Sequence, residues 1–159
     1  MTVSISYRYT DRFSAHLINE RLKAHDIPTC MNAVDLESCT INDITTMITR
    51  CVMECSHLIT VVSDRSAQSW WLPFQIGEAT MIDRRITTYN TLRMQLPEYL
   101  KRWPAMTCSE DVDFFIECYR DEQRNQRIID SESLAAIAGN KRNADIFHTA
   151  LKARIRRGA

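Results

Sequence analysis

Two short stretches of the chain carry residue types that could bind or transform a ligand. The first stretch is Tyr7–Tyr9. The guanidinium of Arg8 could bind a phosphate bidentately, and the two tyrosine rings beside it could stack on a base or a ribose. In Ser69–Ala79, two adjacent tryptophans precede Pro73, and the polar Gln75 follows. Proline fits the first turn of a helix, so this stretch predicts a helix start beside a cleft that Gln75 faces. Each stretch also has an interpretation without a ligand. Arg8 could be a surface arginine between amphipathic rings, and the two tryptophans could pack in a core or an interface.

Other common arrangements for catalysis or metal binding are not found in the sequence. The four histidines are scattered without metal-ligand spacing, no Ser/His/Asp arrangement is evident, and no glycine-rich loop gives a Walker or Rossmann fingerprint. The six cysteines include no CxxC pair, so we expect neither a disulfide framework nor a zinc site. Cys51 and Cys55 share a helix face and are expected to be small core residues. We therefore expect no metal and no cofactor.

Composition limits the class of protein without naming a ligand. The chain has 159 residues, enough for one domain, and equal numbers of basic and acidic residues, 20 of each. A net charge of zero gives no global reason to expect nucleic acid or a membrane surface as a partner. No apolar run approaches the ~20 residues of a membrane span, and no signal peptide precedes the first strand, so we expect a cytoplasmic protein with reduced thiols.

The elements that must position these residues alternate along the first half of the chain. Strands are expected at residues 2–7, 29–31, 57–62 and 86–89, and helices at 12–24, 41–55 and 70–83. The nearly continuous apolar run at 57–62 is typical of a central parallel strand covered on both faces. This order predicts a parallel sheet with helices on both sides. The loops at 7–11, 32–42 and 63–69 would then meet at the carboxyl edge, where open sheets bind ligands.

The pattern changes beyond Thr91. We expect a short helix at 96–100, a turn at Trp103-Pro104 and a helix that begins at Ser109. Residues 120–130 are strongly polar and fit either an exposed helix or a linker. A small helix is expected to end at Gly139, and a last helix to span 144–157. The predicted division is a core of residues 1–92 and a C-terminal part, 93–159, that completes the domain and adds a helical extension.

In their order along the chain, these motifs resemble the TIR (Toll/interleukin-1 receptor) domain, of the bacterial type. Val3–Arg8 is similar to the first-strand box of that family, and Leu58–Ser63 to its third strand. Thr29–Asn32, followed by Leu36, resembles the second strand and the loop after it, where the family often has Asp in place of Asn32. The resemblance implies a three-layer flavodoxin-like α/β fold, with a parallel sheet of four to five strands and helices on both faces.

The resemblance also implies an activity. TIR domains of this kind, such as those of Thoeris antiviral defence, cleave NAD⁺ between nicotinamide and ribose and produce ADP-ribose, a cyclic isomer or a conjugate. By position, Tyr7, Arg8, Asn32, Leu36 and Trp71 would bind this substrate. Self-association through TIR–TIR contacts, and a phage-derived trigger or a downstream effector, are implied as partners, whereas a membrane and nucleic acid are not.

Gln75 stands where the family has its catalytic glutamate, four residues after the tryptophan. Gln keeps the length of Glu and still hydrogen-bonds a ribose hydroxyl. It lacks the negative charge that stabilises the developing oxocarbenium ion, so we expect binding to survive better than turnover. Three explanations stay open: an engineered Glu→Gln variant, a natural inactive member of the family, or Glu78 acting one turn along the helix. We favour the first two, because Glu78 has its own place in the motif.

Two functions of different classes follow. The first is an NAD⁺-processing enzyme that makes a nucleotide signal in bacterial antiphage defence, strongly attenuated by Gln75. The second is a non-catalytic TIR interaction module. A third, weaker interpretation is a flavodoxin-like binding domain of another kind, which shares the strand–helix alternation but does not predict the Ser-Trp-Trp helix. NAD⁺ turnover by a Gln75→Glu variant separates the first from the second.

Overall fold

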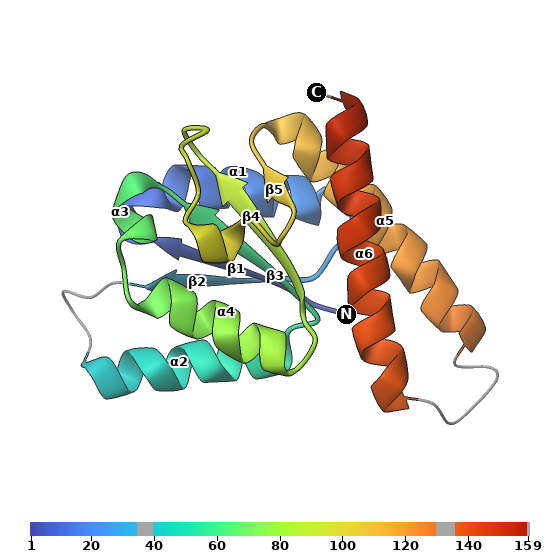
Figure 1. The fold of residues 1–159 in the computed structure, drawn as a ribbon, viewed down its shortest axis with the longest axis horizontal. Coiled ribbons are helices and arrows are strands. Elements are labelled where there is room, and N and C mark those ends of the chain that lie inside the picture. Colours follow the sequence, from blue (N-terminus) through green and yellow to red (C-terminus); the bar gives the residue numbers. More distant parts are fainter. Residues whose placement is uncertain (35–39, 130–135, 159) are drawn as a thin grey trace.

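The computed structural model describes residues 1–34, 40–129 and 136–158, and a parallel sheet forms its centre. Five strands lie in the order β2-β1-β3-β4-β5 (Figure 1). They are β1 (Val3–Arg8), β2 (Thr29–Val34), β3 (His57–Val62), β4 (Arg85–Asn90) and β5 (Ala105–Met106). All four neighbouring pairs are parallel. This is the strand order of flavodoxin-like open sheets, and the predicted α/β fold is confirmed.

Helices cover both faces of the sheet. They are α1 (Arg12–Lys23), α2 (Ile41–Glu54), α3 (Asp64–Ala67), α4 (Trp71–Met81), α5 (Ser109–Ile129) and α6 (Ala136–Gly158), with short 3-10 turns η1 (Tyr9–Asp11) and η2 (Glu98–Leu100). Alternate residues of β3 point to opposite faces, as the pleat requires. Ile59 and Val61 pack with α1, α5 and α6, whereas Leu58 and Val62 pack with α2 and α4. Figure 1 accordingly shows α1 on the opposite side of the sheet from α2 and α4.

Local sequence explains where α2 begins and which face it buries. The Thr40 hydroxyl accepts a hydrogen bond from the Asp43 backbone N–H, and the Asp43 carboxylate accepts one from the Thr40 N–H. This reciprocal cap satisfies two donors that a helix start otherwise leaves open. Ile44, Ile48 and Val52 then recur at helical spacing and are all buried. The helix therefore lies over the sheet in one fixed rotation.

Several element boundaries differ from the sequence-based expectation. The second strand continues to Val34, because it pairs with β1 along its whole length. The loop expected at 63–69 contains the short helix α3, whose start is capped by the Ser63 hydroxyl. A two-residue strand, β5, follows the Trp103-Pro104 turn and extends the sheet beyond β4. The count of five strands lies within the predicted range of four to five.

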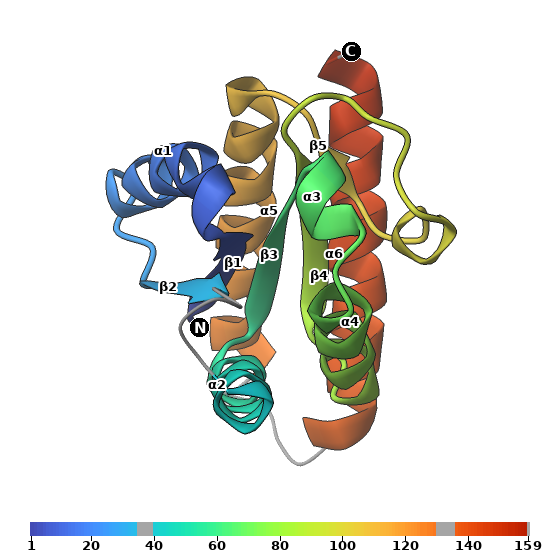
Figure 2. The same ribbon diagram turned by 90° about the vertical axis from the view of Figure 1, so that its left-hand side faces the viewer.

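The C-terminal part packs on the sheet as two long helices that run side by side (Figure 2). The polar residues 120–129 continue α5 and are not a linker. The predicted helix end at Gly139 is wrong, since α6 runs through this position. A helix interior tolerates glycine at a cost of about 1 kcal/mol, and buried contacts of Phe147 and Leu151 with the sheet offset it. Residues 131–135 of the small predicted helix, expected at 131–139, lie outside the described residues.

The division of the chain at residues 92 and 93 stays a prediction. What the structure adds is that Phe115 and Tyr119 of α5 lie in the same apolar cluster as Val3 and Ile5 of β1. Segments from both sides of the division therefore share one core. Within the described ranges, no helix is both long enough and apolar enough to cross a membrane.

Candidate functional site

A row of polar side chains crosses the sheet on the face that α2 and α4 cover. The strand register aligns Asn32 of β2, Ser6 of β1, Thr60 of β3 and Thr88 of β4. Residues aligned in a parallel ladder point to the same face of the sheet. All four are buried. We call these four residues the polar row; it lies between the sheet and the helices α2 and α4.

Helix α4 places Trp71 and Gln75 in the layer that contains the polar row. The two residues lie one turn apart and are 0% and 1% exposed. Gln75 Oε1 and Trp71 Nε1 have no hydrogen-bond partner among the described residues, and the same holds for the hydroxyls of Ser6 and Thr60. Each buried polar group without a partner costs about 1–3 kcal/mol. Buried polar atoms without a partner call for an explanation, and among the described residues they also occur on His57, Arg85 and Glu122 elsewhere in the fold.

Asn32 is held firmly at the edge-strand end of the polar row. Its amide Nδ2 donates to the Ser4 hydroxyl at 2.8 Å. Its Oδ1 accepts from the Cys51 thiol of α2 at 2.8 Å and lies 3.7 Å from the Cys30 sulfur. The carboxamide is therefore fixed in orientation by contacts from its own strand, from β1 and from α2.

Charged residues also lie at the carboxyl edge of the sheet. The Arg8 guanidinium donates to the backbone oxygen of Arg65 at 3.0 Å, which joins the end of β1 to α3. The Asp11 carboxylate accepts from the Ser63 hydroxyl at 2.9 Å. Burial raises the pKa of Asp11, against the opposing effects of the Ser63 hydrogen bond and of the two arginines. Charged groups of both signs thus meet where open parallel sheets bind their ligands.

The predicted site residues do not all share one face. Trp71 and Gln75 of α4 and Asn32 of β2 lie on the face of the sheet that α2 and α4 cover, and Arg8 lies at the end of β1. Tyr7 packs in the cluster on the opposite face, and burial raises its pKa. Leu36 lies outside the described residues. The sequence predicts that Tyr7 and Arg8, as adjacent strand residues, point to opposite faces of the sheet. It does not predict which of the two faces carries the site.

Glu78 faces a different neighbour from Gln75. Its Oε1 accepts a hydrogen bond from the Thr49 hydroxyl of α2 at 2.6 Å, so the carboxylate joins α4 to α2. Gln75, one turn earlier, lies buried over the sheet. Glu78 is therefore engaged in a helix–helix contact, and whether it replaces a catalytic acid stays a prediction.

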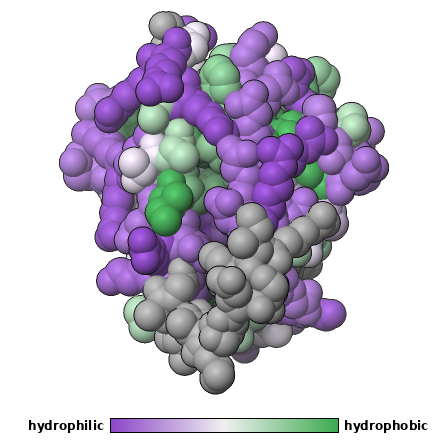
Figure 3. Space-filling view, turned by 90° about the vertical axis from the view of Figure 1, so that its right-hand side faces the viewer, coloured by the Kyte–Doolittle hydropathy of each residue, from purple (hydrophilic) through white to green (hydrophobic). Residues whose placement is uncertain are grey.

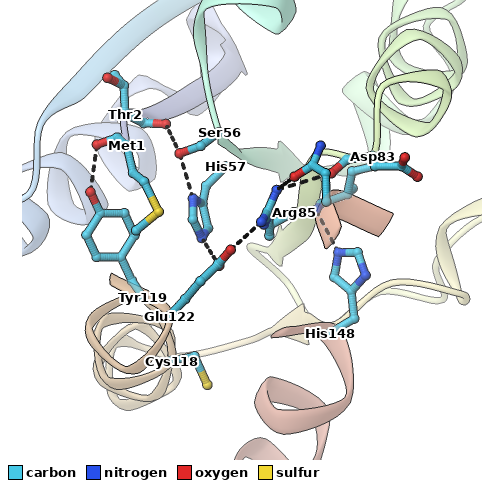
Figure 4. Close-up of polar contacts among 12 residues, drawn as sticks. Met1, Thr2, Ser56, His57, Asp83, Arg85, Cys118, Tyr119, Glu122 and His148 are labelled. Atoms are coloured by element: carbon cyan, nitrogen blue, oxygen red, sulfur yellow. Dashed lines mark hydrogen bonds and ion pairs between the residues drawn. The ribbon is translucent and has the colours of Figure 1, made fainter. Parts of the chain in front are cut away.

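A second buried polar cluster, which the sequence did not reveal, lies at the amino edge of the sheet (Figure 4). His57 and Arg85, the first residues of β3 and β4, converge on Glu122 of α5. His57 Nε2 lies 3.2 Å from Glu122 Oε2, and the Arg85 guanidinium contacts Glu122 Oε1. The His148 ring of α6 accepts a hydrogen bond from the Ile86 N–H at 2.8 Å. We call this group the amino-edge cluster; its traces in the sequence are His57 at the start of an apolar strand and the polar stretch that contains Glu122.

Burial sets the charges in the amino-edge cluster. It lowers the pKa of His57, against the opposing effect of Glu122, and it lowers the pKa of His148 to about 4. Burial alone would raise the pKa of Glu122, but His57 and Arg85 outweigh it and hold that pKa below its usual value. The cluster is thus a carboxylate paired with Arg85, flanked by neutral imidazoles. It fastens α5 and α6 to the sheet.

In the described ranges, no three His, Cys, Asp or Glu side chains group as metal ligands would. No protein-family model matches the chain, and no curated protein matches it. Among solved structures, it is similar to the TIR domains in the structure of the activated Roq1 resistosome directly recognizing the pathogen effector XopQ. The identity is 17%, 99% of each chain is covered, and the TM-score is 0.42. A similarity of this degree identifies neither a family nor an activity.

Proposed function

We propose that this chain is a TIR-type protein that binds NAD⁺ at the carboxyl edge of the sheet beside α4, and that Gln75 strongly attenuates its cleavage. The proposal starts from the ordered motifs of the sequence, above all Trp71-Leu72-Pro73-Phe74-Gln75. The observation that carries it is the environment of Gln75. Its buried carboxamide oxygen has no partner, in the layer that also holds the open hydroxyls of Ser6 and Thr60.

This environment suits an acceptor with a role beyond packing. A side chain selected only to fill the core would be apolar, because an orphaned carboxamide destabilises the fold by about 1–3 kcal/mol. Gln75 hydrogen-bonds a ribose hydroxyl as a carboxylate would, while Arg8 at the carboxyl edge is suited to a phosphate. Asn32, already oriented by its contacts, lies on the same face.

Cleavage of the bond between nicotinamide and ribose builds positive charge on the sugar as nicotinamide leaves. A carboxylate beside the ribose lowers the energy of that state more than the energy of the bound substrate, and a neutral amide does not. Preorganised electrostatic groups of this kind contribute about 3–4 kcal/mol, or 10²–10³-fold in rate. The chain as it stands is therefore a better binder than catalyst.

Nicotinamide release from NAD⁺ by the Gln75→Glu variant tests the proposal. We expect turnover to rise at least about 100-fold over the unchanged chain, with mass spectrometry identifying ADP-ribose, a cyclic isomer or a conjugate. Gln75→Ala is the matched control and should stay inactive. Glu78→Gln in the unchanged chain checks the remaining explanation, since loss of any residual turnover would assign the acid role to Glu78. A folded Gln75→Glu variant that binds NAD⁺ and stays inert would contradict the enzyme proposal.

A second candidate is a non-catalytic module that works through contacts with another copy of the chain. It is favoured by apolar side chains exposed on α1, where Phe13 is 80% exposed and Leu17 lies one turn further on the same side. The face formed by α5 and α6, in contrast, is mainly hydrophilic (Figure 3). Light scattering after size exclusion should show association that Phe13→Ser weakens. If this occurs while Gln75→Glu remains inert, the interaction module is the better description.

A further inference from the structure

Two thiols lie against one side chain of the polar row. Cys30 is two residues before Asn32 on β2, and Cys51 belongs to α2, which covers this face of the sheet. The Cys51 thiol donates to Asn32 Oδ1 at 2.8 Å, and the Cys30 thiol approaches the same oxygen at 3.7 Å. Because both sulfurs contact a single atom, they are neighbours in space although one belongs to a strand and the other to a helix.

The two thiols differ in their access to solvent. Cys30 is exposed and Cys51 is half-buried, and both are free thiols in the structure. β2 is the outermost strand of the sheet, so no further strand covers the outer side of Cys30. Cys55 and Cys118, by comparison, are buried. A small oxidant from solvent would therefore meet Cys30 before either of these two thiols or Cys51.

We propose that Cys30 and Cys51 form a peroxide-responsive thiol pair that closes to a disulfide between β2 and α2. The Cys30 thiolate attacks one oxygen of hydrogen peroxide and the O–O bond breaks, giving a sulfenic acid on Cys30 and, with a proton, water. The Cys51 sulfur then attacks the Cys30 sulfur. The S–S bond forms, the S–O bond breaks, and the hydroxyl leaves as water with the Cys51 proton. In sum the two thiols lose two electrons and two protons, and peroxide is reduced to water.

The order of the steps follows from the surroundings of the two sulfurs. Burial, with the nearby Cys30 and Glu54, raises the pKa of Cys51 to about 11, so this group stays a thiol at neutral pH. Because the thiolate is the form that attacks peroxide, Cys51 is the poorer first nucleophile, and the first step falls to the exposed Cys30. Closure would also withdraw both thiol donors from Asn32 Oδ1 and leave that acceptor to another donor. Oxidation of the two thiols would thus change the hydrogen bonds of Asn32, a residue of the polar row.

Peptide mapping of the full chain after exposure to hydrogen peroxide tests the pair directly. We expect a Cys30–Cys51 cross-linked peptide as the main product, with two thiols lost per chain and both regained on treatment with dithiothreitol. In Cys51→Ser, the sulfenic acid on Cys30 should persist and react with dimedone. In Cys30→Ser, the loss of thiols at low peroxide should disappear. Cys108→Ser, which alters a half-buried thiol elsewhere, is the matched control and should behave as the unchanged chain.

Three results would overturn the proposal. The first is a main cross-link from Cys30 or Cys51 to Cys55 or Cys39. The second is a sulfenic acid that accumulates on Cys30 of the unchanged chain without any cross-link. The third is no oxidation of Cys30 before Cys108. The unchanged chain alone decides between these outcomes, so they do not depend on how the variants fold. They are equally independent of whether the chain binds NAD⁺.

Discussion

The polar layer beneath α4 and the amino-edge cluster are both buried, but the cluster contains paired charges and the layer contains neutral groups. At the amino edge, the Glu122 carboxylate contacts Arg85 and His57, so the charges are matched, although His57 Nε2, Arg85 Nε and Glu122 Oε2 make no hydrogen bond among the described residues. Beneath α4, the groups are neutral and several have no partner within the described part of the chain. A matched cluster gives a fixed structure, whereas open donors and acceptors in the core offer contacts to something that is not part of the chain.

We therefore expect the amino-edge cluster to contribute to stability and the layer beneath α4 to contribute to binding. Removing one member of a buried ion pair leaves the other charged and unpaired, which is strongly destabilising. Removing a neutral group that has no partner relieves a cost instead. Substitutions in the two regions should therefore change the free energy of unfolding in opposite directions, and the following predictions test this.

The largest effect is expected from Glu122→Gln at the amino edge. It leaves the buried Arg85 guanidinium without its carboxylate, and should lower the free energy of unfolding by about 3–5 kcal/mol. Urea denaturation followed by circular dichroism measures the change. Glu117→Gln on the same helix is the control, because this carboxylate is 61% exposed in its contact with Arg154 and should matter little. Equal effects of the two substitutions would remove the distinction between the regions.

An effect of intermediate size is expected from pH. The pKa of His148 is about 4 in the folded chain, below its ordinary value of 6.5, so the unfolded chain binds the proton more tightly. The neutral ring therefore contributes fully to the free energy of unfolding above about pH 6.5. This contribution, about 3 kcal/mol in all, is lost as the pH falls towards 4. Denaturation at several pH values should show this slope.

His148→Gln should flatten the pH dependence between these limits, since Gln keeps an acceptor for the Ile86 N–H but does not titrate. A slope of the same sign should remain, because burial lowers the pKa of His57 too. His16→Gln, at an exposed position of α1, should leave the slope unchanged. An unchanged slope in His148→Gln would show that the ring does not carry this effect.

The smallest effect, and the one of opposite sign, is expected in the polar row. Thr60→Val replaces a buried hydroxyl without a partner by a methyl group of similar shape, and should raise the free energy of unfolding by about 1 kcal/mol. Thr88→Val is the matched control one strand away, because that hydroxyl donates to the Pro104 carbonyl at 3.3 Å. It should destabilise the chain or leave it unchanged. A loss of stability in Thr60→Val would mean that the hydroxyl has a partner and that the layer is closed.

The sequence predicted most of the fold because its information is local. The alternation of strand and helix, the central apolar strand at 57–62 and the helix that begins at the tryptophans all follow from spacing within one element. The short β5 and the continuation of α6 through Gly139 were missed, since neither has a local signal strong enough to compete with proline and glycine. Packing on the existing sheet decides both.

For the candidate site, too, the sequence does not predict features that depend on contacts between distant segments. From the sequence alone, Gln75 is a polar residue at the position of a family acid, and Tyr7 and Arg8 are adjacent residues after a strand. Only the tertiary structure decides that Tyr7 and Gln75 lie on opposite faces of the sheet and that Gln75 is buried in the same layer as hydroxyls that have no partner. Hydrophobic periodicity sets the elements, whereas strand register and helix rotation, which depend on contacts between distant segments, set what each side chain meets.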